Sequence, residues 1–441
     1  MSAGAAGAAK RTFLFLQGPS SPIFRMLAAR LESAGCRCLR INLNAGDWIF
    51  WRRPGALNYR GGLEGWPAYV EGVMTRERVT DLILLGEERP HHQAATQAAR
   101  RLGIRVFVIE MGYLRPDWVT LEREGMSSNS RFPADPAHIL RAGAGLPEPD
   151  WQRRYSQTFL AEASYDLLYN LPNVFLWFLY PGYRRHALFH PLHEYWGWIG
   201  KLLFEGRHRR AAEACIERLE REKARYFVYP LQLQTDYQLR AHSPYRGQKE
   251  AIADVLTSFA GHAPPDTALV VKLHPLDNGL IDWAGFIAGQ AAALGLTGRV
   301  HVIDGGDLNR LLTASLGAVT VNSTAVLHGI RQGMPVKVLG AAIYDIEGMT
   351  CQRPLDAFWT DPARPDPALT DAFFRLVAAA IQVRGNFYSQ AGSAAAAEEI
   401  AGRLLNGTVN MPDAYADPPP RRKPEKRRAG HGVRADAAGG N

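Results

Sequence analysis

Cysteine is scarce in this sequence. The chain has four cysteines among 441 residues, and they are scattered without any CxxC spacing: Cys36, Cys38, Cys215 and Cys351. Such a set supports neither a disulfide framework nor a cysteine-rich metal cluster. We therefore expect a protein of the reducing cytosol with no bound metal.

Long apolar runs are also missing. Residues 173–182 are the most apolar surface candidate, yet they are about half as long as a membrane span and contain Pro181 and Gly182. The N-terminal residues lack the apolar core of a secretory signal, so we expect no export signal. Because Arg184 and Arg185 follow the apolar stretch, contact with lipid headgroups is one interpretation, and a buried helix is the other.

Two familiar nucleotide motifs are absent as well. The sequence contains neither GxGxxG nor GxxxxGK[ST], so it supports neither a dinucleotide site nor a P-loop. Nothing resembles a nucleic-acid-binding module, and we expect no nucleic-acid partner. The net charge of +8 suits phosphorylated ligands or an anionic membrane surface, although ordinary solvated charge would explain it equally well.

The length and composition favour two soluble α/β domains. Single domains mostly stop growing near roughly 250 residues, and the content of 46% hydrophobic and 21% charged residues is ordinary for a globular protein. Apolar strand patterns alternate with helical ones in the first half, at residues 12–16, 38–42, 81–85 and 106–109. Alternation of this kind predicts βαβ units and a parallel sheet.

The pattern changes in the second half of the chain. Residues 148–223 read as a helical insertion rich in aromatic residues, and strands return at 226–229, 268–272, 300–303, 318–321 and 336–339. Beyond residue 406 apolar periodicity ends, and a Pro-rich basic segment follows. Because it has little apolar area to bury, we expect residues 406–441 to be a disordered basic tail, either solvated or touching anionic lipid.

Two strand ends in the second half present groups that suit an anion. Lys272 and His274 follow a buried strand that Pro275 ends, and ligands of open α/β sheets bind at the carboxyl ends of strands. Ser323 and Thr324 stand in the same position about fifty residues later, at the expected start of a helix. Together they predict a phosphate site, whereas a core histidine beside a surface lysine is the alternative.

The first half offers further strand-end candidates. Gln17, Gly18 and Pro19 follow the first strand and open the first helix, where backbone amides can face a ligand. Three short polar side chains end the second strand: Asn42, Asn44 and Asp47. Ordinary turn chemistry would explain both groups, since these are common turn residues.

The segment from Glu110 to Glu122 carries charge in apolar company. Glu110, Arg115, Asp117 and Glu122 fall within thirteen residues after a buried strand. Buried charges are costly unless they are paired or used, so we expect either a functional carboxylate or a structural pair with Arg115.

Taken together, these motifs resemble the KpsS/LipB-type capsule polysaccharide biosynthesis family. The resemblance spans about residues 11 to 390 and rests on seven segments: Gln17-Gly-Pro19, Asn42-x-Asn-x-Gly-Asp-Trp48, Tyr59-Arg-Gly61, Glu110-x-Gly-Tyr-Leu-Arg-Pro-Asp117, Pro230-Leu-Gln-x-Gln-x-Asp236, Lys272-x-His-Pro275 and Asn322-Ser-Thr324. The combination is far more specific than any one of them.

The resemblance implies a GT-B-like fold, in which two Rossmann-like, doubly wound domains face a central cleft. We expect an N-terminal domain with its helical extension at 11–205 and a donor-binding domain at 206–405. The implied activity is a retaining β-Kdo glycosyltransferase that moves Kdo from CMP-Kdo to a lysophosphatidylglycerol acceptor and so starts the capsule poly-Kdo linker. No cofactor is implied beyond the CMP-Kdo donor.

The resemblance also implies roles for individual residues. His274 would bond the cytidine phosphate and Lys272 would add charge, in a donor site completed by Gln232, Asp236, Asn322, Ser323 and Thr324. The acceptor side or cleft would use Gln17, Gly18, Pro19, Asn42, Asn44, Asp47 and Arg115. Glu110 is the first candidate for the nucleophile, but Met111 stands where related motifs often carry a second acid, so Asp117 and Glu122 remain candidates.

The implied location is the cytoplasmic face of the bacterial inner membrane, as a peripheral protein. Its partners would be CMP-Kdo, a phospholipid acceptor, the anionic membrane surface, and other capsule assembly proteins with the exporter. Two alternatives remain open: a non-catalytic assembly or export component that binds nucleotide-sugar or polymer, and a GT-B transferase with another CMP- or UDP-sugar donor.

Overall fold

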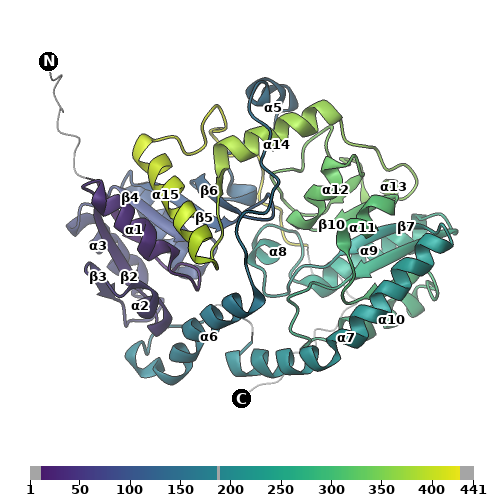
Figure 1. Ribbon diagram of the computed structural model, residues 1–441, viewed down its shortest axis with the longest axis horizontal. Helices are drawn as coiled ribbons and strands as arrows, with labels where there is room; N and C mark the ends of the chain where they lie inside the picture. Colours follow the sequence, from purple (N-terminus) through teal and green to yellow (C-terminus); the bar gives the residue numbers. More distant parts are fainter. Residues whose placement is uncertain (1–10, 186–188, 428–441) are drawn as a thin grey trace.

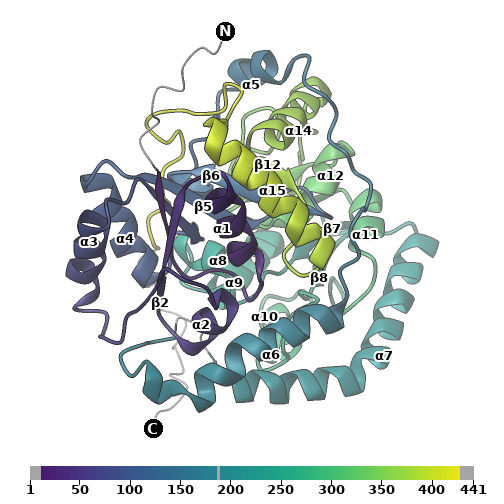
Figure 2. The ribbon, with the colours of Figure 1, turned by 60° about the vertical axis from the view of Figure 1, so that its left-hand side comes forward.

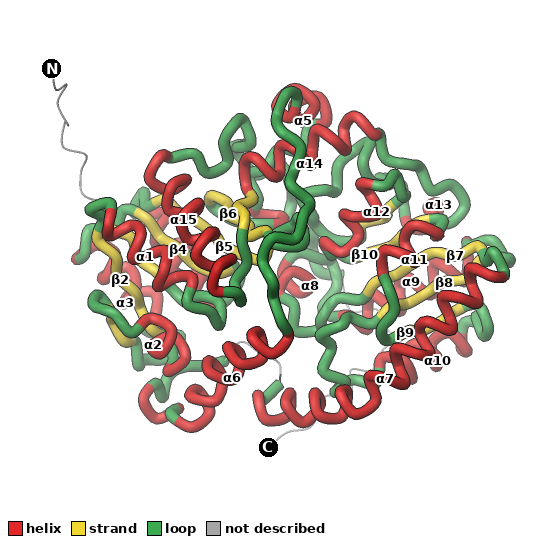
Figure 3. Tube along the Cα trace, in the orientation of Figure 1, coloured by secondary structure: helices red, strands yellow, loops and turns green. Residues whose placement is uncertain are grey.

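Two α/β domains lie side by side in the computed structural model, which describes residues 11–185 and 189–427 (Figure 1). Each domain is built on one sheet, and helices cover both faces of each sheet (Figure 3). The expected GT-B-like arrangement is confirmed. Among the described residues, no helix has the length and apolar character to cross a bilayer.

The first sheet has the strand order β12-β6-β5-β4-β1-β2-β3. Its strands are β1 (Thr12–Phe15), β2 (Arg37–Asn42), β3 (Ala56–Asn58), β4 (Asp81–Leu85), β5 (Arg105–Met111), β6 (Trp118–Arg123) and β12 (Gln382–Arg384). The pairs from β5 to β3 are parallel, whereas β6 runs antiparallel to both β5 and β12. The helices of this half are α1 (Ile23–Ser33), α2 (Ala45–Trp51), α3 (Trp66–Arg76), α4 (Pro90–Arg101), η1 (Ser127–Asn129) and α5 (Pro136–Gly143).

The second sheet is wholly parallel, with the order β11-β10-β7-β8-β9. Its strands are β7 (Arg225–Pro230), β8 (Thr267–Lys272), β9 (Val300–Ile303), β10 (Gly317–Thr320) and β11 (Val336–Val338). The helices around it are α8 (Tyr237–Ala241), α9 (Gln248–His262), α10 (Trp283–Ala293), α11 (Leu308–Ala314), η3 (Thr324–Val326), α12 (Leu327–Arg331), α13 (Leu355–Phe358) and α14 (Pro367–Ile381). The central strands β7, β8 and β10 are almost wholly buried, which explains why continuous apolar runs predicted them.

The helical insertion lies along one edge of the molecule, against both domains (Figures 1 and 2). It consists of α6 (Phe159–Phe175), η2 (Trp177–Leu179) and α7 (Pro191–Arg221). Thr158 caps the start of α6 and His190 caps the start of α7, each by accepting a backbone N–H. The expected domain boundary at residue 206 falls inside α7.

The end of the expected second domain belongs to the first. β12 pairs with β6, and α15 (Gln390–Asn406) packs against α1 on the first sheet. Val383, Ile400 and Leu404 are buried in one core with Phe13 and Phe15. The chain therefore crosses back after α14, so the expected 206–405 domain ends at about residue 381.

The segment after α15 departs from the disorder we expected. Residues 407–427 run across both domains as a strap, and Ala414 and Asn410 within it are fully buried. Arg421 donates to backbone carbonyls on both sides of the crossing, and the side chain of Lys423 lies 2.9 Å from each carboxylate oxygen of Glu88. This segment has no apolar core of its own, and the bonds of Arg421 and Lys423 to distant parts of the chain hold it in place. The remainder of the expected tail, 428–441, lies outside the described residues.

Candidate functional site

A cleft lies between the domains where the carboxyl ends of their parallel strands face one another. It contains a pocket of ≈360 Å³ whose lining comes from β5 and the loop after it, the start of α6, the loop after β8 and the segment after β12. Arg115, Glu162, Leu276 and Tyr388 are among its walls. Crevices at strand carboxyl ends are the usual binding sites of such sheets.

Of the three expected catalytic acids, Asp117 lines this pocket, and Glu110 lies next to its lining residue Met111. Glu110 is the second-last residue of β5, is half-buried, and accepts a backbone N–H from Met111 at 3.0 Å. Burial raises the pKa of Glu110, and the charge of Asp236 raises it further, while the Met111 N–H, Arg89 and Arg115 lower it. Since Asp236 belongs to the second domain, the two carboxylates influence each other across the cleft.

Asp117 and Glu122 have their carboxylates committed to the fold. Asp117 accepts the backbone N–H groups of Arg154 and Tyr155 at 2.7 and 2.8 Å, and the amide of Asn386 at 3.2 Å. Glu122 is fully buried and accepts from the hydroxyls of Tyr113 and Ser130. Burial raises the pKa of Glu122 to about 7, and this residue is not among those that line the pocket.

Arg115 and His274 link the two domains electrostatically. Burial lowers the pKa of Arg115, while Glu110, Asp236 and Glu162 raise it, so one guanidinium serves carboxylates of three elements. Burial lowers the pKa of His274 to about 4, with further lowering by Arg115, Lys201 and Lys272. The imidazole is therefore neutral at pH 7. Its Nδ1 accepts the Leu276 N–H at 3.0 Å, which leaves Nε2 as the N–H donor.

Lys272 ends β8 with its side chain almost fully buried. Its Nζ donates to the Gly305 carbonyl at 2.6 Å, which occupies one of three ammonium N–H groups. Burial lowers the pKa of Lys272, whereas Asp304 raises it. The lysine is thus held beside His274 by the loop that follows β9.

The other expected donor-site residues surround the ends of β7 and β10. Gln232 and Asn322 bond each other reciprocally, side chain to side chain at 2.8 Å and side chain to backbone at 3.1 Å. Asp236 caps α8 by accepting the Gln238 N–H at 2.8 Å, and burial raises its pKa. Ser323 and Thr324 are half-exposed, and Ser323 accepts the Ala325 N–H. At this end of the second sheet, the amides of Gln232 and Asn322 bond each other, whereas Ser323 and Thr324 are partly accessible to solvent.

Of the expected acceptor-side residues, Arg115 lines the pocket, whereas Gln17, Asn44 and Asp47 are buried beneath the helical insertion. Gln17 donates to the hydroxyls of Tyr169 and Tyr183 at 2.6 and 3.0 Å, and Asn44 donates to Tyr169 at 3.0 Å. Asp47 forms an ion pair with Arg40 at 2.8 Å and accepts from Tyr169 at 3.1 Å. These groups therefore fasten the helical insertion to the first sheet.

The remaining residues of that prediction have packing roles. Asn42 donates to Asn58 at 3.0 Å. A side chain at Gly18 would lie 2.7 Å from the ring of Phe24, so the glycine permits close packing of the first turn, and Pro19 beside it is buried.

Some residues near the cleft carried no sequence signal. Tyr388 lines the pocket, and its pKa is raised by burial first and then by Glu162 and the carboxylate of Glu110. Tyr388 reaches this position because β12 pairs with β6 of the first sheet. A strand of three residues gives no sequence pattern from which that pairing could be predicted. Glu162 arrives from the helical insertion.

A group of potential metal ligands lies elsewhere between the domains. Glu87, Glu88 and His242 are the three-residue group of this kind among the described residues, and the Lys423 ammonium neutralises Glu88 within it. Burial raises the pKa of Glu87 to about 7 and lowers that of His242 to about 4. The group is therefore close to charge balance with the strap in place.

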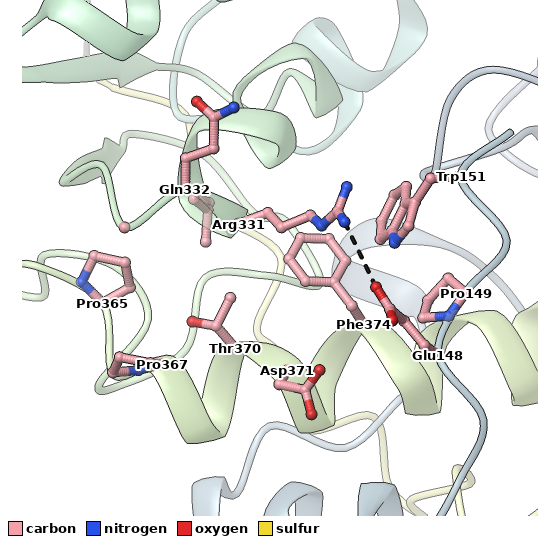
Figure 4. A pocket seen from close by; sticks show the side chains of 12 residues that line it. Glu148, Pro149, Trp151, Arg331, Gln332, Pro365, Pro367, Thr370, Asp371 and Phe374 are labelled. Carbon is pink, nitrogen blue, oxygen red and sulfur yellow. Dashed lines mark ion pairs between the residues drawn. The ribbon is translucent and has the colours of Figure 1, made fainter.

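A second pocket, of ≈390 Å³, lies between the loop before α6, the end of α12 and the start of α14 (Figure 4). Arg331 lies 4.0 Å over the Trp151 ring and pairs with Glu148 at 3.6 Å. None of the expected site residues lines it.

Comparisons with known proteins found a matching family model and several similar proteins. A family model described as "Capsule polysaccharide biosynthesis protein" matches residues 80–388. The chain is 30% identical over 382 residues to the capsule polysaccharide export protein KpsS of Escherichia coli, covering 86% of this chain and 97% of that protein. It is 32% identical over 383 residues to the capsule polysaccharide modification protein LipB of Neisseria meningitidis serogroup A, covering 86% and 91%.

Among solved structures, the chain is similar to the β-Kdo 2,7 transferase KpsC of Thermosulfurimonas dismutans. The TM-score is 0.43 at 13% identity, over 90% of this chain and 99% of that one.

Proposed function

We propose that this chain, which belongs to the capsule polysaccharide biosynthesis family, is a glycosyltransferase that moves Kdo from CMP-Kdo to a lysophosphatidylglycerol acceptor. The product would start the capsule linker. The observation that carries the proposal is the cleft pocket, whose walls include Arg115 of the first domain and Leu276, two residues after His274, of the second. The charges of Glu110 and Asp236 both act on Arg115, and Arg115 acts on His274. A carboxylate opposite a cation-lined strand end suits transfer from an activated anionic donor.

The donor site follows from the chemistry of the second strand-end group. A neutral His274 with its proton on Nε2 donates a hydrogen bond to a phosphate oxygen, and Lys272 and Arg115 supply positive charge close by. Preorganised donors stabilise the charge that develops on departing CMP. We therefore propose a leaving group neutralised by side chains, with no requirement for a metal ion.

Glu110 is the proposed nucleophile. Its carboxylate would attack the anomeric carbon of Kdo as the bond to the CMP phosphate breaks. The acceptor hydroxyl would then attack the same carbon from the face that CMP left, opposite Glu110, and release the carboxylate as its proton passes to a phosphate oxygen of the departed CMP. Two inversions would so retain the configuration. The bonds that occupy Asp117 and Glu122 favour Glu110 over both.

The proposed location is the inner face of the inner membrane, because the acceptor is a lipid. Capsule assembly proteins and the exporter would be partners there, since they handle the product. The donor, by contrast, is water-soluble and would reach the cleft from the cytosol.

The proposal is tested by turnover with purified protein. CMP-Kdo generated in situ and micellar lysophosphatidylglycerol should yield CMP and a Kdo-lipid, with and without a chelator. His274→Ala should lower kcat/KM by about 100-fold or more, the usual cost of losing a preorganised donor. Absence of Kdo-lipid under conditions in which a related enzyme is active would overturn the proposal. Activity that depends on an added metal ion would overturn the metal-free mechanism.

A further inference from the structure

The helical insertion exposes large apolar side chains that the proposed chemistry does not use. On α7, Trp196, Ile199 and Leu203 recur every third or fourth residue and are 71%, 48% and 75% exposed. Leu160 and Phe175 of α6 and Trp177 of η2 are 66–76% exposed. These six residues define what we call the hairpin face. Monomeric soluble proteins seldom expose such a patch without a partner for it.

The two helices of the hairpin that carries this face pack on each other, and α7 is tied to the second domain. Phe159 of α6 packs on Trp198 of α7 with ring centroids 5.6 Å apart, and Tyr195 donates to Asp166 at 3.2 Å. Lys201 donates to the Pro275 carbonyl at 3.0 Å, which ties α7 to the loop after β8. One side of α7 is therefore committed to the protein, and the apolar side chains project from the other.

Charge on the same hairpin has one dominant sign. Over the described residues of the hairpin, 159–185 and 189–221, the exposed charged side chains are six arginines, namely Arg184, Arg207, Arg209, Arg210, Arg218 and Arg221, and three glutamates, namely Glu205, Glu217 and Glu220. Exposed Trp and Leu beside clustered arginine is the composition of helices that lie in a bilayer interface. The complement of this charge is an anionic lipid surface.

The hairpin face is also continuous with the cleft. Thr158, Phe159 and Glu162, at the start of α6, line the same pocket as Arg115 and Tyr388. In two views α6 and α7 lie along the same side of the molecule (Figures 1 and 2). A lipid whose acyl chain stays in a bilayer beneath this face would have its headgroup near the mouth of the pocket.

We propose that the hairpin face docks the protein on an anionic phospholipid bilayer, with its apolar side chains in the interface and its arginines at the headgroups. This inference rests on the proposed function for the lipid nature of the acceptor, but binding itself needs neither donor nor turnover. Docking by this face would present the cleft to an acceptor that never leaves the membrane.

Flotation of the purified full chain with vesicles tests the inference. The wild type should float with vesicles that contain phosphatidylglycerol, and salt should weaken the binding. Trp196→Ser combined with Leu203→Ser should lower the partition coefficient at least about tenfold, since both side chains leave the apolar phase. The matched control is Leu63→Ser combined with Leu102→Ser, which removes apolar side chains 37% and 40% exposed on another part of the molecule.

Charge is tested separately with Arg207→Gln, Arg209→Gln and Arg210→Gln together. At about a fivefold change per charge near an anionic surface, the triple variant should bind on the order of 100-fold more weakly to phosphatidylglycerol vesicles. It should bind phosphatidylcholine vesicles as the wild type does.

Two results would overturn the docking proposal. One is wild-type flotation by the Trp196→Ser and Leu203→Ser variant. The other is a wild-type dimer that this variant disperses without loss of vesicle binding, since a second copy would then cover the face. Transfer to a water-soluble short-chain acceptor, which should be unchanged in the same variant, separates failure of docking from failure of the transferase proposal.

Discussion

Replacing Arg421 with alanine should destabilise the protein as a whole, because this side chain fastens the strap to two distant loops. Its guanidinium donates to the carbonyls of Phe132 and Pro133 at 2.6 and 3.0 Å, and to those of Ala342 and Ile343 at 3.1 and 2.6 Å. Water can partly replace these half-buried bonds, so each is worth about 1 kcal/mol net. The four together predict a loss of about 4 kcal/mol.

Thermal unfolding measures this loss. An unfolding entropy of about 2.1 cal/mol/K per residue, over 441 residues, gives about 0.9 kcal/mol per degree, so Arg421→Ala should lower Tm by about 4 °C if the chain unfolds as one unit. Arg422→Ala is the matched control, since that neighbouring arginine is exposed. A Tm within 1 °C of the wild type, or an equal loss in the control (about 4 °C), would refute the role of the strap.

Three further predictions concern buried or cleft charges. The pKa of Glu122 is raised from 4.5 to about 7, so its protonated form stabilises the native state by about 3 kcal/mol below pH 4.5. This stabilisation is lost as the pH rises to about 7. The Tm of Glu122→Gln, measured relative to that of the wild type, should therefore increase between pH 5 and pH 8. CMP at a hundredfold above its Kd should stabilise the protein by about 2.7 kcal/mol, and UDP should not. Lys272→Met should weaken CMP binding about 10- to 100-fold. Stabilisation by UDP alone would exclude a CMP-sugar donor. Arg115 lowers the pKa of Glu110, so Arg115→Gln should move the acid limb of the kcat/KM profile to higher pH, and an unmoved limb would contradict an ionised Glu110.

Much of the fold could be predicted from the sequence because its parallel strands are buried on both faces. Continuous apolar runs marked β1, β4, β5, β7, β8 and β10, and apolar residues interrupted by one charged residue or a histidine marked β2, β9 and β11. The short strands β3 and β12 escaped because each has three residues, and β6 because its antiparallel pairing with β5 follows a turn inside a charged segment. The return of β12 and α15 to the first domain depends on contacts between residues far apart in sequence.

The candidate site, like the fold, could be predicted only in part from the sequence. The strand-end rule correctly placed Lys272, His274 and Glu110 at or just after the ends of buried strands, and their roles stay predictions. The same rule placed Asn44 and Asp47 at an edge, but it could not show that Tyr169 covers them. Burial of that edge is set by a helix more than a hundred residues away in the chain.

The resemblance put Glu110 first among the three acids, and the structure adds the bonds that distinguish it from Asp117. Both acids lie in one charged segment that begins at the end of β5. Their difference comes from partners: backbone N–H groups of Arg154 and Tyr155 reach Asp117 from a distant loop. The strap was missed for a related reason, since its order comes from bonds to carbonyls that no local pattern records.

The most direct test of the central claim is the mass of the lipid acceptor after incubation with CMP-Kdo and each of two variants. The wild type should add one Kdo to lysophosphatidylglycerol, and Glu110→Gln should lower the rate by at least about 1,000-fold while keeping CMP affinity and Tm. Asp117→Asn, a matched change in the same segment, should keep a rate far above that of Glu110→Gln. A Glu110→Gln protein that transfers Kdo at the wild-type rate would contradict the account.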